Sequence, residues 1–166
     1  VGVAQAQVLR SCIEPTEEQV AEFGPLTVQV QDHWTLPLDA DALTHPELVS
    51  SVPGFEAKSN FAVELTRKLY TYNAINAAVC YIGAERGYVW LSDAANDSEI
   101  ADLANQVGVE SSAALIAEFG FDEGEQQDWS DRALAKYQDV TIRDPIERNA
   151  RDPIRKLGLH DRILGP

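Results

Sequence analysis

Apolar and polar positions follow helical spacing over most of the chain, which predicts a mainly α protein with one small β-hairpin. The longest helical pattern covers residues 60–83, and we expect Gly83 to end it as a C-cap. Further helices are expected over 97–107, 110–119 and 125–139, because each of these patterns adjoins a glycine.

In the first third of the chain, the periodic segments of apolar and polar residues are shorter. Residues 2–13 predict a short helix. The alternating segment Leu26–Val30 predicts a half-buried strand, with a return strand over His33–Trp34 and Leu36–Leu38. Residues 39–58 are rich in turn-forming residues and predict a loop. Together these segments supply the expected hairpin.

The pattern of 60–83 contains three polar residues in an otherwise apolar run: Lys68, Asn73 and Asn76. On a helix of 3.6 residues per turn, Asn76 lies about 80° and Asn73 about 140° from Lys68, so all three share one broad face. Lysine and asparagine are costly to bury without partners. One interpretation is structural, with Lys68 reaching solvent and the amides bonding to loops. The other is that the three groups form a catalytic wall.

The catalytic interpretation has a specific chemistry. A lysine held against apolar neighbours has a lowered pKa, and its neutral amine can take a proton from an alcohol. An amide N–H of Asn73 aimed at the same oxygen would stabilise the alkoxide as it forms. These are the requirements for oxidising an alcohol to a ketone, provided that another group accepts the hydride.

A second cluster of candidate residues lies near the end of the chain. Residues 143–162 contain six of the thirteen basic residues, against four acidic ones. The sequence Arg-Asp-Pro-Ile occurs at 143–146 and again at 151–154, where each aspartate could cap a short helix that begins at proline. The cluster is typical of an anion-binding site, and equally of a helix face with salt bridges.

Composition narrows the possible functions. The 166 residues carry a formal net charge of −14, which disfavours nucleic acid and anionic membranes as partners. Cys12 and Cys80 lie far apart, as is usual for unpaired buried thiols of a cytoplasmic protein. The three histidines make no metal-ligand pattern, and no glycine-rich phosphate loop occurs. We therefore expect no metal and no nucleotide site in this segment.

The two clusters together resemble a known family. The segments Lys68–Asn73 and Ala77–Gly83 are similar to the catalytic helix of long-chain mannitol dehydrogenases, which include mannitol-1-phosphate 5-dehydrogenases and hexuronate oxidoreductases. The segment Arg148–Gly158, followed by Asp161–Pro166, resembles the second conserved region of their substrate domain, in the form closest to the sugar-phosphate branch. The similarity extends over most of 8–166.

The resemblance implies roles for individual residues. Lys68 matches the general base, and Asn73 matches the amide that contacts the reacting oxygen. Arg148 and Lys156 match a basic pair that binds substrate hydroxyls or the acidic end group. Further contacts to a phosphorylated substrate are expected from two more residues, Arg155 and Arg162.

Asn76 departs from the family pattern, because the family usually has a histidine at this position beside the substrate oxygen. Asparagine can donate a hydrogen bond there but cannot carry a proton at neutral pH. The departure leaves the fold assignment intact, but it bears on substrate identity and on activity.

The resemblance also implies how the full-length protein is divided into domains. Residues 1–166 would be a single multi-helical C-terminal domain, like that of 6-phosphogluconate dehydrogenase, which binds substrate. An N-terminal Rossmann domain outside this chain would bind most of the NAD, so the segment alone is expected to be inactive. The expected activity is that of a polyol or polyol-phosphate dehydrogenase. The alternatives are a hexuronate (fructuronate or altronate) or free-polyol oxidoreductase, and a non-catalytic helical domain that docks a partner.

Overall fold

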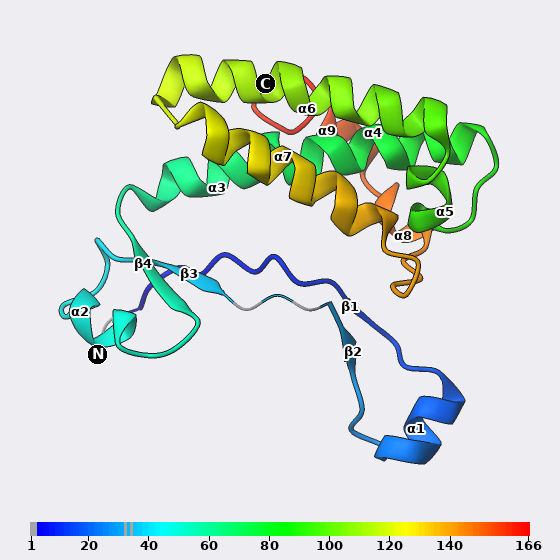
Figure 1. Ribbon diagram of the computed structural model, residues 1–166, viewed down its shortest axis with the longest axis horizontal. Helices are drawn as coiled ribbons and strands as arrows, with labels where there is room; N and C mark the ends of the chain where they lie inside the picture. The colour runs from blue at the N-terminus through cyan, green and yellow to red at the C-terminus, as the bar shows by residue number, and fades with distance from the viewer. Residues whose placement is uncertain (1–2, 32, 34) are drawn as a thin grey trace. The chain divides into compact units, whose positions relative to one another are not determined.

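The computed structural model describes residues 3–31, 33 and 35–166, which form two compact units (Figure 1). The first unit covers Val1–Leu65 and the second covers Thr66–Pro166. The assignment of the whole chain to one domain stays a prediction. Trp34, expected in the return strand, lies outside the described residues.

The described residues of the first unit form two short helices and two pairs of strands, besides the start of a longer helix. Its helices are α1 (Glu17–Phe23) and α2 (Pro46–Ser50), and its strands are β1 (Cys12–Ile13), β2 (Gln29–Val30), β3 (Leu36–Asp39) and β4 (Phe55–Lys58). Thr16 begins α1 through a capping box: its side chain accepts a hydrogen bond from the Gln19 amide, and the Gln19 side chain accepts one from the Thr16 amide.

Three expectations for this unit were wrong. The helix expected over 2–13 is absent from residues 3–13, which carry β1 instead. The strand around Val30 pairs antiparallel with β1 and not with the segment that follows it. That later segment is β3, which pairs in parallel with β4 inside the supposed loop. Short apolar runs do not specify their partners, since pairing depends on residues far away in the chain.

The second unit is a bundle of helices. They are α3, which begins in the first unit (Phe61–Tyr70), α4 (Tyr72–Glu85), α5 (Leu91–Ala95), α6 (Ser98–Phe119), α7 (Glu123–Gln138), α8 (Ile146–Asn149) and α9 (Pro153–Lys156). The three longest, α4, α6 and α7, pack against one another (Figure 1). Aspartates cap α6 and α7, whose first-turn amides donate to Asp97 and Asp122.

The core of the bundle lies between these three helices. Ile75, Val79 and Cys80 of α4 are fully buried, together with Ile100 and Leu115 of α6. Burying an aliphatic side chain of this size stabilises a fold by about 1.5–3 kcal/mol. Cys12 is exposed, so the expectation that both thiols are buried was wrong for that residue; neither cysteine forms a disulfide.

Two glycines that seemed to end helices are packing positions inside them. Gly83 is buried in α4, where an added Cβ would lie 2.7 Å from the Cβ of Ala94. Gly108 is buried in α6, where an added Cβ would lie 2.2 Å from the Oγ of Ser130. The two helices expected over 97–107 and 110–119 are therefore one. Glycine here permits close approach of neighbouring helices, and not a change of chain direction.

The predicted fold class is confirmed: the described chain is mainly helical with a small antiparallel strand pair. None of the helices in the described ranges has both the length and the apolar character needed to cross a membrane.

The packing around Gly83 predicts that Gly83→Ala destabilises the second unit. The new methyl group would lie 2.7 Å from the Ala94 Cβ and 2.9 Å from the Ile146 Cδ1. Overpacking of this kind costs about 1–3 kcal/mol. Urea unfolding should show this loss for Gly83→Ala, whereas Ala84→Ser, at the next and exposed position, should stay within about 0.5 kcal/mol of the parent. Equal stability of the two variants would contradict the packing argument.

Candidate active site

The predicted catalytic helix is two helices that meet at Thr71. Lys68 lies in the last turn of α3, and Asn73 is the second residue of α4. Thr71 separates them with φ −104° and ψ −77°, and its side chain makes no capping bond to α4. Instead, its Oγ1 accepts a hydrogen bond of 2.9 Å from the Nε2 of Gln126 on α7. The expectation of one continuous helix over 60–83 was therefore wrong.

Arg67, the residue before Lys68, holds this junction in place. Its side chain is buried, with the residue only 5% exposed, and its Nε donates to the Oε1 of Gln126 at 2.8 Å. Its guanidinium lies 4.4 Å from the ring centres of both Phe121 and Trp129. Contacts of a cation with two aromatic faces add to the hydrogen bond. The end of α3, and with it Lys68, is thereby fixed against α7.

Lys68 is half-buried, and its pKa is lowered from the ordinary value. Burial is the larger cause, because it disfavours the charged amine, and repulsion from the Arg162 guanidinium adds to it. The structure thus brings Arg162, about ninety residues later in the chain, within electrostatic range of Lys68. A lysine in this environment is a better proton acceptor at neutral pH than a solvated one.

The two asparagines differ in their surroundings. Both are half-buried on α4. The Nδ2 of Asn76 donates to the Oδ1 of Asn149 on α8 at 3.3 Å. Asn76 is therefore joined to the C-terminal basic segment, while Asn73 lies one turn closer to Lys68.

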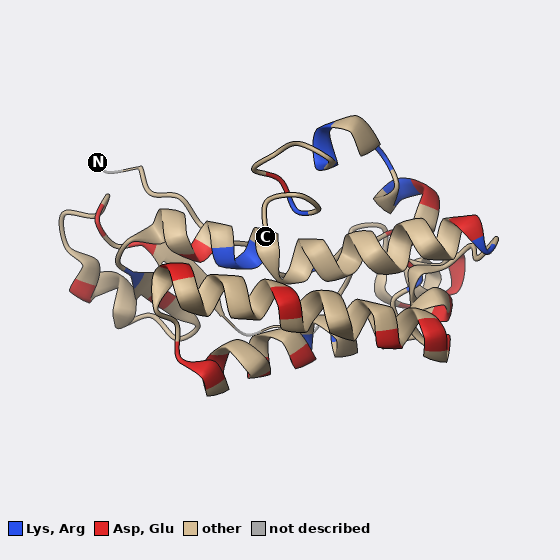
Figure 2. Cartoon of the chain, turned by 90° about the horizontal axis from the view of Figure 1, so that it is seen from above, with Lys and Arg blue, Asp and Glu red and all other residues tan. Residues whose placement is uncertain are grey.

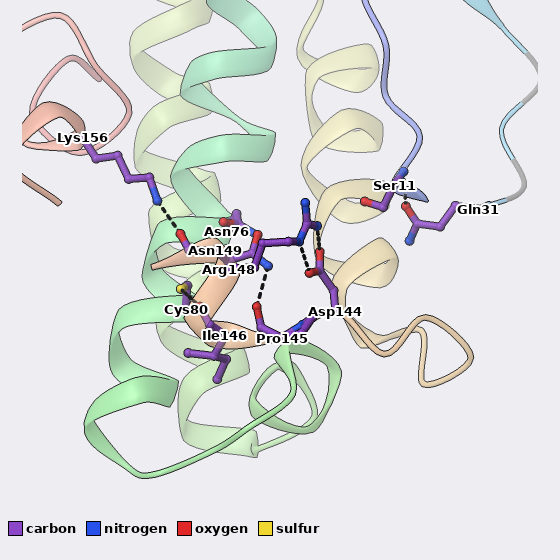
Figure 3. Close-up of polar contacts among 10 residues, drawn as sticks. All are labelled: Ser11, Gln31, Asn76, Cys80, Asp144, Pro145, Ile146, Arg148, Asn149 and Lys156. Atoms are coloured by element: carbon purple, nitrogen blue, oxygen red, sulfur yellow. Dashed lines mark hydrogen bonds and ion pairs between the residues drawn. The ribbon is translucent and has the colours of Figure 1, made fainter. Parts of the chain in front are cut away.

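Asn149 was missed by the sequence analysis, although it lies between the two basic residues singled out there. Its Nδ2 donates to the backbone oxygen of Pro145 at 3.1 Å, and its backbone oxygen accepts a hydrogen bond from the Lys156 ammonium (Figure 3). Together with the bond from Asn76, these contacts join α4, α8 and α9. In the sequence, the sign of this role was an asparagine side chain next to Arg148, within the basic motif.

Lys156 is more deeply buried than expected for a substrate contact. The residue is 7% exposed, and its ammonium lies 5.5 Å from the ring centre of Tyr81. Burial is the main cause that lowers the pKa of Lys156, and repulsion from the Arg162 guanidinium lowers it further. The Tyr81 hydroxyl donates to the backbone oxygen of Ala150 at 3.3 Å, which keeps the ring beside the lysine.

Arg148 is bound by a carboxylate. Its Nε donates to the Oδ1 of Asp144 at 2.8 Å, and its second nitrogen bonds the other carboxylate oxygen (Figure 3). The Asp144 side chain is 8% exposed, against 49% for that of Arg148. The expectation that Asp144 caps a helix was wrong, because Pro145 holds the N-cap position of α8. In the second copy Pro153 begins α9 as expected, but Asp152 makes no side-chain capping bond.

Arg155 and Arg162 share one partner, Asp161. The Arg155 guanidinium lies 3.1 Å and that of Arg162 2.8 Å from its carboxylate oxygens. The Arg162 side chain is 15% exposed and that of Arg155 is 56% exposed. The charges of both arginines lower the pKa of Lys156, and that of Arg162 also lowers the pKa of Lys68.

A cavity of about 440 Å³ lies between α4, α6 and the C-terminal segment. Its α4 wall consists of three alanines, Tyr81 and Ile82, and Arg162 lines it from the C-terminal segment. Arg162 is the predicted site residue that it includes. The cavity therefore adjoins the basic cluster but is mostly apolar, and Lys68 is not among its walls.

Neither a group of metal-binding side chains nor a glycine-rich dinucleotide turn is found among the described residues. Nowhere in residues 3–31, 33 and 35–166 do three metal-binding side chains come together. The parallel pair β3–β4 is joined through α2 by a connection without the glycine-rich turn that dinucleotide phosphates require.

Comparison with known proteins identifies the family of the chain. Residues 64–166 match the family model of the mannitol dehydrogenase C-terminal domain. The match covers well over half of the chain and begins close to the start of the second unit. The chain belongs to this family, and its second unit is thus a polyol dehydrogenase family domain, part of an oxidoreductase.

The buried position of Arg67 predicts a strong effect on stability. Arg67→Ala removes a hydrogen bond to a charged group and two aromatic contacts, and it leaves Gln126 without that donor. We expect the free energy of unfolding to fall by about 2–4 kcal/mol in urea titrations. Arg132→Ala, at an exposed position on α7, is the control and should change it by less than about 0.5 kcal/mol. A loss below about 1 kcal/mol for Arg67→Ala would contradict the anchoring role.

Proposed function

We propose that this chain carries the substrate-binding and catalytic part of an NAD-dependent polyol or polyol-phosphate dehydrogenase. The observation that carries the proposal is the environment of Lys68. Its family match and its lowered pKa, caused by burial and by the Arg162 charge, agree with a general base. Mannitol 1-phosphate and fructose 6-phosphate are the substrate pair that we favour.

The proposed chemistry uses the residues on both sides of Thr71. The neutral amine of Lys68 takes the proton from a secondary hydroxyl group of the polyol. The Asn73 amide donates a hydrogen bond to the same oxygen and so stabilises the developing negative charge. The carbon atom then loses a hydride, and a ketone remains. In the reverse direction the Lys68 ammonium returns the proton to the carbonyl oxygen.

NAD would accept the hydride on an N-terminal Rossmann domain of the same protein. This domain is the partner that the family membership supports. We propose a cytoplasmic location, and we expect the segment alone to be inactive because it has no hydride acceptor.

Substrate recognition is assigned to the C-terminal basic segment. Arg148 and Lys156 are the proposed contacts to substrate hydroxyls or to the acidic end group, with Asn76 beside the reacting carbon. Arg155 and Arg162 are the proposed extra contacts for phosphate; since Arg162 acts electrostatically on Lys68, it fits this role better.

The alternatives differ either in the substrate or in the class of protein. A hexuronate or a free polyol would use the same base, with a carboxylate or no charge at the end of the molecule. A non-catalytic interaction domain was suggested by Asn76 in place of histidine. The lowered pKa of Lys68 favours an enzyme, because shifted pKa values of this kind gather at catalytic sites.

Loss of the Lys68 amine should abolish most of the activity. In the full-length protein we expect Lys68→Ala to lower kcat for NADH-linked reduction of fructose 6-phosphate by about 10² to 10⁴-fold. Arg86→Ala, at the opposite end of α4, is the control and should keep the parent rate. A change below about tenfold for Lys68→Ala corresponds to under roughly 1.4 kcal/mol, too little for a lost general base.

The lowered pKa of Lys68 also predicts a pH dependence. The neutral amine is the active form in polyol oxidation, so kcat should rise with pH through the Lys68 pKa and then level off. Because the pKa is lowered, the midpoint should lie below the ordinary lysine value of 10.5. Lys68→Arg, whose guanidinium keeps its proton, should show a low rate without this rise. A midpoint at 10.5 or above in the parent would sink the proposal that burial activates Lys68.

A further inference from the structure

Thr71 is the residue between the two helices that carry the proposed base and the proposed amide. It follows α3, which ends at Tyr70, and precedes α4, which begins at Tyr72. Its amide donates to the backbone oxygen of Arg67 at 2.9 Å, and its own backbone oxygen accepts a hydrogen bond of 3.0 Å from the Ile75 amide. The junction is therefore a bend within a continuous series of backbone hydrogen bonds, and not a loop.

The bend decides how α4 is directed relative to α3. Because a single residue separates the two helices, their mutual direction depends on its backbone angles. Thr71 has φ −104° and ψ −77°, well away from the helical values of about −63° and −42°. In an unbroken helix Lys68 and Asn73 would lie about 140° apart around the axis. The angle between these two side chains is therefore set at Thr71.

The side chain of Thr71 is held by a buried amide. Thr71 and Gln126 are both fully buried. The Thr71 Oγ1 accepts a hydrogen bond of 2.9 Å from the Nε2 of Gln126, and the Oε1 of the same amide accepts one of 2.8 Å from the Nε of Arg67. One side chain of α7 thus holds both the last turn of α3 and the bend that follows it (Figure 1).

A merely structural role for this bond is the alternative, and Ser112 on α6 provides the comparison. Its Oγ accepts a hydrogen bond of 3.2 Å from the same Gln126 nitrogen, and the residue is buried. The two hydroxyl groups therefore have the same donor and similar burial. Only that of Thr71 lies at the bend, three residues after Lys68 and two before Asn73. Loss of either hydroxyl should weaken the fold, but only one of the two losses should change the site.

We propose that Thr71 is a positioning residue, whose hydroxyl group, bonded to Gln126, holds the Lys68 amine and the Asn73 amide in the geometry in which both reach the same substrate oxygen. Since Thr71 is fully buried, it acts through these two residues and not on the substrate. The inference rests on the proposed function and deepens it, because it assigns the alignment of the two reacting groups to a contact between the bend and α7.

The test compares two variants of the full-length protein that each remove one acceptor from the Gln126 amide. Thr71→Val removes the hydroxyl group at the bend with little change of shape, and Ser112→Ala removes the one on α6. Thr71→Ser keeps the hydroxyl group and serves as the conservative variant. For each variant, kcat and KM would be measured for NADH-linked reduction of fructose 6-phosphate, and stability by urea unfolding.

We expect Thr71→Val to lower kcat about tenfold or more, with KM changed less than about threefold, because small misplacements of reacting groups are costly. Ser112→Ala should keep kcat within about twofold of the parent, although its urea midpoint falls as well. Thr71→Ser should retain most of the parent kcat. Equal losses of kcat in Thr71→Val and Ser112→Ala would mean a structural role and overturn the proposal, as would an unchanged kcat in Thr71→Val.

Should Thr71→Val fail to fold, Thr71→Ala takes its place. The smaller side chain leaves room for a water molecule to accept the Gln126 hydrogen, which lessens the cost of the unpaired amide. A kcat of Thr71→Ala no lower than that of Ser112→Ala would then overturn the proposal.

The pKa of Lys68 gives a second readout, which does not depend on activity. Basic residues gather in the C-terminal segment and acidic ones follow the long helices (Figure 2), and the variants alter none of these charges. Burial is the larger cause of the lowered pKa of Lys68, so a loosened bend should let the amine reach water and move its pKa toward the ordinary 10.5. NMR of isotope-labelled lysine side chains, with the Lys68 signal assigned by its loss in Lys68→Arg, should show this rise in Thr71→Val and not in Ser112→Ala.

This measurement separates the inference from the proposed function. If the parent does not reduce the ketose, the proposed function fails, and the pKa of Lys68 still decides whether Thr71 fixes the position of the amine. A rise in Thr71→Val alone supports the positioning role. The same pKa in the parent and in Thr71→Val, or an equal rise in Ser112→Ala, overturns it.

Discussion

The buried hydrogen bond between Arg67 and Gln126 is the constraint on which the site depends. Gln126 is fully buried on α7, and its amide nitrogen also donates to the hydroxyl groups of Thr71 and Ser112. One side chain thus ties the end of α3, the start of α4 and the middle of α6 to α7. Because an unpaired buried guanidinium is very costly, this geometry has little freedom. Lys68 follows Arg67 directly, so the same hydrogen bonds hold its backbone in position.

The C-terminal segment is organised by a second set of polar contacts, centred on Asn149. This residue joins Asn76 of α4 to Lys156 of α9, while Asp144 holds Arg148 beside them. Basic side chains that would repel one another are kept in place by an amide, a carboxylate and an aromatic ring. The Arg162 charge also lowers the pKa of Lys68. In the proposed function, Arg162 would therefore act both on the substrate phosphate and on the base.

Much of the fold and part of the site could be predicted from local pattern. The extent of α7, its aspartate cap and the helical class follow from periodicity and capping chemistry, which act within a few residues. Gly83 and Gly108 were misread as helix ends because glycine serves both as a terminator and as a packing contact, and only a neighbouring helix distinguishes the two. The strand pairs were misassigned for the same reason, since β-pairing is a non-local choice.

The sequence by itself determined which groups are available: a lysine and two asparagines in an apolar run, and a basic motif near the end. It also determined the helical class, because capping and periodicity are short-range effects. The tertiary structure decided which of these groups meet. It broke the long helix at Thr71, joined Asn76 to Asn149, and brought Arg162 within electrostatic range of Lys68. None of these meetings follows from local pattern, since burial and repulsion between residues far apart in the chain exist only once the helices have packed.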